Sequence, residues 1–446
     1  MQSQPAAIPP GPKGHLLTGQ LGELRRDILG LFERCARDYG DFVPLRFGPK
    51  KAFLVNRPDL IEAVMTADSG SIRKPFVQEV LRPLIGDALV IAEGEAWRRQ
   101  RRMVQPAFHR ERIAGYGAIM VDLARRAAAS FQDGEVRTIS DDMQRITLAI
   151  ASKCLFDMDI DGEGRAFGDA SDAIMEFFEA RMASLLPLPL WVPTPLNRKI
   201  RRAMQAADRL VHELISRRRR GGEVRSDVLS TLLAAEYEGG GHMADQQIRD
   251  EVFSLLIAGQ EASAVSLSWT FHLLAQHPDV DARLQEELRT VLGGRSPEPG
   301  DLPRLRYTEQ IIKEVMRLYP PFYFYGRDVI ASCDIGEYRV HAGATLFVSP
   351  WLIQRDERYF EQPLAFDPGR WTDDAAKELP KYAYFPFGGG SRACVASAFA
   401  MMESVLVLAT LAQSFRFEPV PGHTVTPWPV VTIRPKQGIK LKIARR

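Results

Sequence analysis

One cysteine stands in a glycine-rich segment that leads directly into an apolar stretch. The segment reads Phe387-Gly388-Gly389-Gly390-Ser391-Arg392-Ala393-Cys394-Val395, and the apolar stretch continues to Leu408. We expect Cys394 to lie at a helix N-terminus, where free N–H groups and the helix dipole stabilise a thiolate. Such a thiolate is suited to be the axial ligand of a haem iron that activates oxygen. The plain alternative is a small buried cysteine after an ordinary loop.

Two charged residues upstream have a spacing that suits an ion pair. Glu314 and Arg317 are three residues apart, so they share one face of a helix. Both can reach Arg370, which lies in the segment Phe366-Asp367-Pro368-Gly369-Arg370-Trp371. Groups of this kind are catalytic in some proteins and structural in others. The spacing alone therefore predicts a cluster and leaves its role open.

Taken together, these segments resemble the cytochrome P-450 superfamily, and further segments agree in the family's order. The signature Phe-x-x-Gly-x-Arg-x-Cys is matched at Phe387, Gly390, Arg392 and Cys394, with Gly388 between them. Glu-x-x-Arg is matched by Glu314 and Arg317, Phe-x-Pro-x-Arg-Phe/Trp by residues 366–371, and Trp-x-x-x-Arg by Trp97 and Arg101. Residues 258–261 resemble the family's oxygen-side helix. The resemblance runs from Pro9-Pro10-Gly11-Pro12 to the C-terminal strands.

The resemblance implies a fold, a cofactor and a reaction. We expect a mainly α fold with small β-sheets, in which haem b (iron protoporphyrin IX) lies between a long central helix and the cysteine loop. The implied activity is a haem-thiolate monooxygenase that inserts one oxygen atom of O2 into an apolar organic substrate, such as a terpenoid, fatty acid or polyketide-like molecule. The alternatives are a peroxide-using or non-oxygenating enzyme, for oxidative coupling or dehydration, and a haem-binding sensor without turnover.

The resemblance also assigns roles to the residues around the cofactor. Positions that contact the haem propionates in the family are occupied here by Trp97, Arg101, Arg327 and Arg392. Phe387 packs beneath the sulfur in the family, and glycines such as Gly388 let the backbone lie flat against the porphyrin. Glu314, Arg317 and Arg370 hold the cysteine loop, which is a structural role.

The oxygen-side segment departs from the family at one position. Ala258 and Gly259 are small and leave room beside the haem, but Ala262 stands where most members have threonine. That hydroxyl normally relays the protons needed to split the O–O bond. Ser263 is one residue further, so its side chain points about 100° away around the helix. We therefore expect a water, held by Glu261 or by the substrate, to complete the relay. The alternative is an enzyme that loses reducing equivalents as peroxide.

Substrate contacts are expected from an aromatic run and from family regions that line the distal pocket. The candidates are Phe76, Val90, Ile91, Phe177, Phe178, Ala258, Tyr323, Phe324 and Val430. Each of these side chains also suits an ordinary hydrophobic core, which is the commoner place for such residues. Together they favour an apolar substrate.

Composition narrows the class of protein. The 446 residues include 58 basic and 56 acidic side chains, so net charge does not indicate nucleic acid. Four scattered cysteines and unclustered histidines favour a reduced, cytoplasmic compartment and no zinc site. We expect no membrane anchor, because no apolar stretch reaches the roughly 18 residues that span a bilayer. We expect a separate electron source rather than a fused flavin or nicotinamide domain, and the resemblance implies a ferredoxin or flavodoxin with its NAD(P)H reductase.

The elements that position these residues can be read from periodicity and turns. We expect one domain over residues 1–446, because no linker or repeat marks a boundary. Helices are predicted over residues 21–39, 244–276 and 308–318, each bounded by turn or proline signals. A hairpin is predicted over 42–47 and 52–55, and short strands over 338–340 and 345–348.

Overall fold

The computed structural model describes residues 10–67, 70–74, 81–160, 165–183, 188–221, 227–237 and 240–446. The chain divides into two compact units. The first unit combines Met1–Val80 with Glu314–Cys394, and the second combines Leu81–Lys313 with Val395–Arg446. Phe76, one of the residues expected to contact substrate, lies outside the described residues.

The first unit is built on a five-stranded sheet with the order β1-β2-β8-β5-β3. Its strands are β1 (Phe42–Phe47), β2 (Lys50–Val55), β3 (Ile72–Arg73), β5 (Tyr325–Val329) and β8 (Thr345–Val348). The predicted hairpin forms, since Phe42 pairs with Val55 in antiparallel register. β2 then pairs in parallel with β8, which joins the N-terminal segment to the later one. Pro44 is tolerated because β1 is an edge strand.

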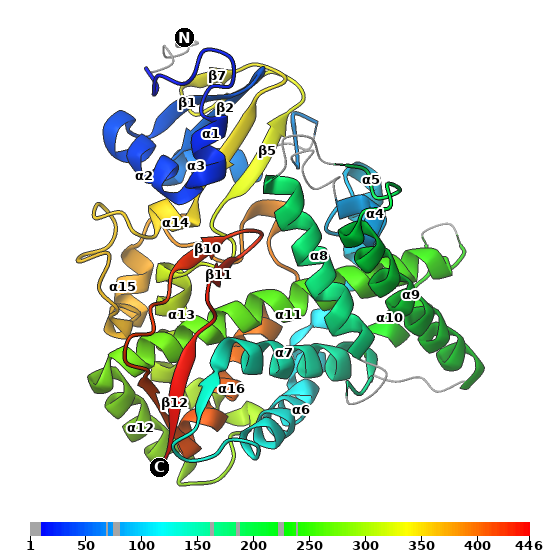
Figure 1. Ribbon diagram of the computed structural model, residues 1–446, viewed down its shortest axis with the longest axis vertical. Helices are drawn as coiled ribbons and strands as arrows, with labels where there is room; N and C mark the ends of the chain where they lie inside the picture. The colour runs from blue at the N-terminus through cyan, green and yellow to red at the C-terminus, as the bar shows by residue number, and fades with distance from the viewer. Residues whose placement is uncertain are drawn as a thin grey trace. The chain divides into compact units, whose positions relative to one another are not determined.

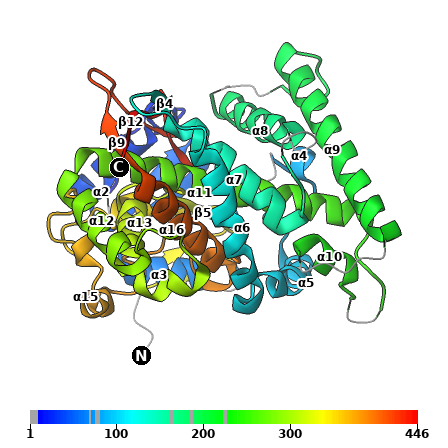
Figure 2. The same ribbon diagram turned by 90° about the horizontal axis from the view of Figure 1, so that it is seen from below.

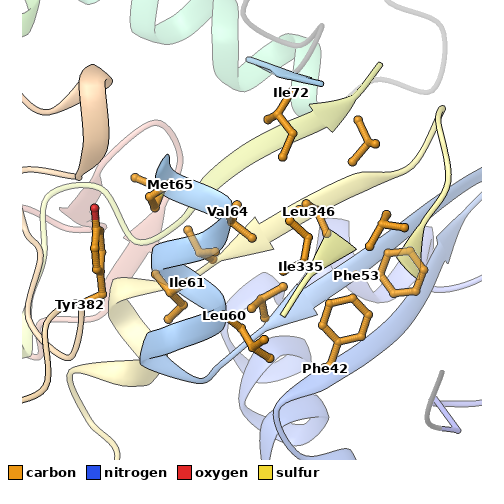
Figure 3. Packing of buried hydrophobic residues seen from close by; sticks show 14 of the residues in the cluster. Phe42, Phe53, Leu60, Ile61, Val64, Met65, Ile72, Ile335, Leu346 and Tyr382 are labelled. Atoms are coloured by element: carbon orange, nitrogen blue, oxygen red, sulfur yellow. The ribbon is translucent and has the colours of Figure 1, made fainter. Parts of the chain in front are cut away.

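Helices accompany this sheet in the first unit. They are α1 (Leu21–Arg26), α2 (Ile28–Tyr39), α3 (Pro58–Thr66), α14 (Pro350–Ile353) and α15 (Asp373–Glu378), with a small hairpin of β6 (Cys333–Ile335) and β7 (Tyr338–Val340). In Figure 3, α3 turns Leu60, Ile61 and Val64 toward the strands, where Leu346 is fully buried. This apolar contact fixes the core of the unit.

One predicted helix proved to be two. The expected helix over residues 21–39 is broken at Asp27, whose φ of −158° is extended. The Asp27 carboxylate accepts a hydrogen bond from the Gly30 N–H at 2.9 Å, so it caps α2. The apolar periodicity continues across the break, which is why the pattern concealed it.

The second unit is mostly helical. Its helices are α4 (Arg82–Ile85), α5 (Gly94–Val104), α6 (Arg110–Ala128), α7 (Ile139–Phe156), α8 (Arg165–Ala183), α9 (Pro195–Gly221), α10 (Val228–Ala234), α11 (Asp245–Gln276), α12 (Pro278–Leu292) and α16 (Ser397–Ser414). α13 (Arg306–Leu318) begins in this unit and ends in the first. The 32-residue α11 packs against α7 (Figure 1), and α16 packs against α6 (Figure 2). The predicted long central helix is therefore confirmed.

Two small sheets complete the second unit. One has the order β4-β12-β9, formed by β4 (Val136–Thr138), β9 (Phe415–Pro419) and β12 (Lys440–Arg445). The other is a hairpin of β10 (Pro427–Pro429) and β11 (Ile433–Pro435). Strands near the C-terminus were expected without bounds, and the structure gives them as β9 to β12. β4 was not predicted, because it is only three residues long.

One helix of the described residues is long and apolar enough to cross a bilayer. It is α16, Ser397–Ser414, and 67% of that stretch is buried inside the fold. Its apolar side chains pack against α6 and α11. The composition of α16 is thus that of a core helix.

Candidate active site

The loop before Cys394 is shaped by its own backbone hydrogen bonds. The Cys394 N–H donates to the Phe387 carbonyl oxygen at 2.9 Å, and the Ala393 N–H donates to Gly390 at 3.2 Å. Cys394 is exposed, whereas Cys35 and Cys154 are buried. The helix that follows begins at Ser397, so the expectation that Cys394 occupies its N-terminus is corrected by three residues. The intervening residues continue the loop, because Ala396 is only the N-cap.

Glycine is required in this loop because of close neighbours. A Cβ atom on Gly390, whose φ is +64°, would collide with the carbonyl oxygen of Met65. A Cβ on Gly389 would collide with the ring of Tyr382. At Gly388, φ is +70°, which disfavours any residue with a Cβ. The three glycines therefore allow the loop to press against α3 and the tyrosine.

Two tyrosines brace the loop, and the sequence analysis gave neither of them this role. The Tyr382 hydroxyl accepts from the Gly390 N–H at 3.0 Å. The Tyr325 hydroxyl donates to the Pro386 carbonyl at 3.2 Å. Burial, and then the negative charge of nearby Cys394, raises the pKa of Tyr325, so it remains a neutral donor. The aromatic run that contains Tyr325 was the available signal, but it was assigned to substrate.

Glu314 is the centre of a buried network. Its carboxylate and the Arg317 guanidinium are 0% exposed and form a two-pronged ion pair at 2.8 and 2.9 Å. Arg370 Nε donates to Glu314 Oε1 at 2.9 Å, and the Trp371 indole N–H donates to Oε2 at 2.9 Å. The Asp367 backbone N–H adds a further bond at 3.1 Å. The expected cluster of Glu314, Arg317 and Arg370 is present.

Arg317 extends this network to three backbone carbonyls. Its guanidinium donates to Gln354 at 2.8 Å, to Pro363 at 2.6 Å and to Ala365 at 2.9 Å. Gln354 is buried, and a buried carbonyl needs a hydrogen-bond donor. The pair thus ties α13 to the segment 354–371, which supports the structural role rather than a catalytic one.

The residues expected to contact the haem propionates lie on β5, on α5 and in the turn before Cys394. Arg327 on β5 is 8% exposed and donates to the Gly326 carbonyl at 2.8 Å, while Arg392 lies in the turn before Cys394. Trp97 and Arg101 are one turn apart on α5 and half-buried, and Arg101 contacts Gln105 at 3.4 Å. Their role toward a cofactor stays a prediction.

The central part of α11 has one accessible face. Ala258 is exposed and Ala262 is half-buried, although nearly all their neighbours on this helix are buried. Gly259 was expected to leave room beside the haem, but a Cβ there would point at Ala151 and Leu155 of α7, 3.8 Å away. This is an ordinary van der Waals contact, so the α7–α11 packing does not require glycine, and Gly259 is half-buried like Ala262. The role of Gly259 beside the haem stays a prediction.

Glu261 is held by the C-terminal hairpin. Its Oε1 accepts from the Thr432 hydroxyl at 2.7 Å and from Arg434 Nε at 2.6 Å. Its Oε2 accepts from Arg434 Nη2 at 2.5 Å. The Glu261 side chain is 4% exposed. Thr432 and Arg434 were missed because nothing in their local sequence links them to a helix about 170 residues earlier.

Ser263 also has a fixed partner. Its hydroxyl lies 2.5 Å from Glu403 Oε2 on α16, so it turns away from the face of Ala262. Burial raises the pKa of Glu403 to about 8, and Glu403 Oε1 has no partner among the described residues. Burial, and then the neighbouring Glu403, also raises the pKa of Cys154. A single glutamate in the otherwise apolar stretch 397–412 was the signal that could have identified Glu403.

The residues expected to contact substrate differ in how far they are buried. Phe324 packs against Phe32 and Phe347 at 6.2 and 5.6 Å between ring centroids, and Tyr323 is 3% exposed, so both have the contacts of core residues. The other candidates range from buried to accessible: Phe177 is 1% and Ile91 4% exposed, Phe178 and Val430 are half-buried, and Val90 is 40% exposed. Their contact with a substrate stays a prediction.

The residues around Cys394 fit a haem with one protein ligand. Among the described residues, no three His, Cys, Asp or Glu side chains are grouped to hold an ion, so a metal site made by protein alone is not formed there. An accessible thiol on a glycine-rich loop suits an iron whose other ligands come from a porphyrin. Arg392 and Arg327 are cations that would balance its carboxylates.

Comparison with known proteins agrees with this chemistry. A family model described as cytochrome P-450 matches residues 9–443. The chain is 38% identical to a cyclooctat-9-en-7-ol 5-monooxygenase of Streptomyces melanosporofaciens, with 87% of this chain and 84% of the relative covered. It is 33% identical to a pentalenene oxygenase of Streptomyces avermitilis, with 92% and 91% covered. A solved cyanobacterial CYP120A1 with bound retinoic acid shares the fold at a TM-score of 0.87 and 24% identity, covering 100% of both chains. The chain therefore belongs to the cytochrome P-450 family of haem-iron oxidoreductases.

Proposed function

We propose that this protein is a monooxygenase that hydroxylates a terpenoid, using haem b and electrons from a separate ferredoxin or flavodoxin and its NAD(P)H reductase. The observation that carries the proposal is the accessible Cys394 on a loop braced by Tyr325, Tyr382 and the Glu314 network. The substrate class is supported by the similar proteins named for terpenoid substrates, cyclooctat-9-en-7-ol and pentalenene. We place the protein in the cytoplasm as a single haem domain, residues 1–446.

Each residue has a separate task in this proposal. When bound, the haem iron with a thiolate ligand supplies oxygen activation. Cys394 provides that thiolate, and Arg392 and Arg327 neutralise carboxylates that would be costly to bury unpaired. Glu314 and Arg317 hold the segment 354–371 in place. Ala258 and Ala262 give the accessible face of α11 where the apolar substrate and oxygen are accommodated.

Proton supply is where this chain departs from its relatives. Ala262 has no hydroxyl, and the Ser263 hydroxyl donates to Glu403 Oε2 on α16. Glu261 accepts three hydrogen bonds from Thr432 and Arg434. We propose that a water beside Ala262, oriented by the substrate or by the Glu261 backbone region, moves the proton. The same departure favours a peroxide-using enzyme as the second candidate function.

One set of assays separates the candidates. The reduced, carbon-monoxide-treated protein should give a band near ~450 nm, whereas a band typical of imidazole ligation would contradict the Cys394 assignment. Pentalenene and cyclooctat-9-en-7-ol are then incubated with NADPH, a ferredoxin and its reductase, or with hydrogen peroxide alone. A hydroxylated product that requires the electron-transfer proteins supports the proposal. Product from peroxide alone supports the second candidate, and a Soret shift without product in either assay indicates a sensor.

A further inference from the structure

The C-terminal hairpin β10–β11 is attached to α11 at two places. The first is Glu261, which binds Thr432 and Arg434 as described above. The second is the indole N–H of Trp269, which donates to the Ile433 carbonyl oxygen at 2.8 Å. Glu261 and Trp269 are eight residues apart, slightly more than two turns, so they lie along one side of the helix. The helix thus contacts the hairpin at two levels.

The hairpin has little hydrogen bonding of its own. Its register pairs Pro427 with Pro435, Trp428 with Arg434 and Pro429 with Ile433. Three of these six residues are prolines, which have no N–H to donate to the ladder. A two-stranded hairpin in water is marginal even with full pairing. The conformation of this segment therefore depends on what it is attached to.

The attachment through Glu261 is the charged one and is mostly buried. The side chains of Glu261 and Arg434 are 4% and 21% exposed. A buried carboxylate requires a partner, and both partners of this one come from β11 or the residue before it. Val430, expected to contact substrate, lies in the turn between Thr432 and β10, where its N–H donates to the Thr432 carbonyl at 3.1 Å. Displacement of Thr432 would therefore move Val430.

We propose that Glu261 is a positioning residue: through Thr432 and Arg434 it fixes the turn that carries Val430, and so sets the shape of the substrate pocket. This inference rests on the proposed function for the contact of Val430 with substrate. It differs from the expected role of Glu261, because a carboxylate that accepts three hydrogen bonds from the hairpin is committed to holding it. Proton movement is then assigned to water and substrate.

A neighbouring acid provides the matched control. A cavity of about 230 Å³ lies beside Arg434 and is lined by Asp172 of α8, Ser268 of α11 and Gly438, among others. Asp172 is close enough for its charge to affect Arg434, but within the part of the chain that the structure describes it is not hydrogen-bonded to the hairpin. Asp172→Asn therefore removes a carboxylate from the same surroundings without removing the attachment.

The test compares Glu261→Gln, Thr432→Val, Arg434→Met and Asp172→Asn, each as the haem-loaded protein. Hydrogen–deuterium exchange of residues 427–435 is measured first, because it does not depend on turnover. Binding of 4-phenylimidazole and of imidazole is then followed by the Soret shift. The larger probe reaches the pocket wall, and the small one serves as a control for the haem itself.

The proposal predicts that Thr432→Val and Arg434→Met, which leave the Glu261 carboxylate in place, reproduce the effect of Glu261→Gln. Hairpin exchange should rise about tenfold, and the Kd of 4-phenylimidazole should rise about tenfold while that of imidazole stays constant. Asp172→Asn should match wild type in every measurement. Thr432→Val removes the hydroxyl that bonds Glu261 and keeps the branched shape of the side chain and the charge of Arg434, so it remains informative if Arg434→Met does not fold.

Two results would overturn the inference. If the hairpin variants behave as wild type and only Glu261→Gln changes the solvent isotope effect on turnover, Glu261 is a proton carrier. If hairpin exchange rises but 4-phenylimidazole binding is unchanged, the attachment is structural and does not shape the pocket. Failure of the proposed function is seen separately, as absence of the ~450 nm band or of product in the wild type.

Discussion

At the scale of single residues, the position of Ala262 decides how the site handles protons. A threonine hydroxyl at this position would stand on the one accessible face of the central part of α11. Ser263 does not replace it, because its hydroxyl is 2.5 Å from Glu403 on α16. The side chains of Ala262 and Ser263 therefore lie on different faces of α11, and the Ser263 hydroxyl is already hydrogen-bonded.

This arrangement gives a prediction for Ala262→Thr. Because the proposed relay already runs through water or substrate, we expect the added hydroxyl to leave peroxide release per NADPH consumed unchanged or higher. A clear fall in peroxide release would show that protons limit coupling, since a positioned proton donor contributes roughly 10²–10⁴-fold to proton transfer. Peroxide and product are quantified in the same reaction. Unchanged or higher peroxide release in Ala262→Thr would show that water or substrate already performs the relay.

The control for this experiment is Ser263→Ala. It removes a hydroxyl one residue away, and we expect peroxide release to stay at the wild-type level. Stability should fall by about 1–3 kcal/mol, because Glu403 then has a buried carboxyl without its partner. A clear rise in peroxide release by Ser263→Ala would mean that the Ser263 hydroxyl takes part in proton delivery to oxygen.

Glu403 itself gives a prediction about pH. Its pKa is raised by burial from 4.5 to about 8, so the folded protein retains a proton that the unfolded chain releases. Protonated Glu403 therefore makes its full contribution to the free energy of unfolding below pH ~4.5, and this contribution is lost as the pH rises toward 8. Glu403→Gln stays neutral, so its stability relative to wild type should increase with pH across this window by at most ~1.4 kcal/mol per pH unit.

Urea unfolding of wild type and Glu403→Gln at several values between pH 5 and pH 9 measures this slope. Glu95→Gln, a matched change at a side chain that is 71% exposed, should give a flat difference. If the difference in unfolding free energy between Glu403→Gln and wild type also does not change with pH, the Glu403 carboxyl is ionised throughout this range. Its pKa is then not raised by burial.

At the scale of elements, the Glu314 network joins α13 to the segment that precedes the cysteine loop. Glu314→Ala leaves Arg317 with an uncompensated buried charge, which typically costs about 3–5 kcal/mol. We expect low haem content and a lower unfolding midpoint, while any protein that retains haem keeps the wild-type product pattern. Haem absorbance per protein and guanidinium unfolding measure both effects.

Glu337→Ala is the matched control for this prediction. Glu337 also pairs with an arginine in the first unit, but the Arg57 and Glu337 side chains are 33% and 41% exposed. Exposed pairs contribute about 0–1 kcal/mol, so haem content should not change. Full haem content but altered products in Glu314→Ala would instead assign Glu314 to substrate selection.

The elements that sequence predicted well are those with strong local patterns. The strands 42–55, 338–340 and 345–348 and the helix α11 were recognisable from alternation, apolar length and bounding glycine or proline. The break at Asp27 was hidden, because an N-cap inside a continuous apolar pattern does not interrupt the periodicity. β10 and β11 carry prolines that argue against strands, so their pairing could not be anticipated.

The site was predictable where neighbours in sequence are neighbours in space. Glu314 and Arg317 are three residues apart, and Cys394 stands in a compact motif. The partners that were missed are distant along the chain: Glu403 is 140 residues from Ser263, and Arg434 is 173 residues from Glu261. Only the folded chain brings these groups together, and they change the roles of Ser263 and Glu261.

At the scale of the whole molecule, net charge cannot steer an electron-transfer partner. The 58 basic and 56 acidic residues nearly cancel, so long-range attraction is weak. Any steering must come from local groups such as Arg98, Arg99 and Arg102, which are exposed on α5. Glu95 lies near two of them, 3.1 Å from Arg98 and 3.8 Å from Arg102, and reduces the local positive charge.

The proposed ferredoxin would be attracted to these arginines if its own surface is acidic. If it docks on α5, Arg102→Glu should raise the KM for ferredoxin by about tenfold at low salt, because the substitution reverses a charge at the contact. The effect should shrink at 0.5 M salt, where the Debye length is only a few ångströms. Arg289→Glu on α12, a side chain that is 75% exposed, makes the same change in net charge and should leave the KM unaltered. Equal effects of the two variants would mean that total charge governs association, and no effect of either would place the docking surface elsewhere.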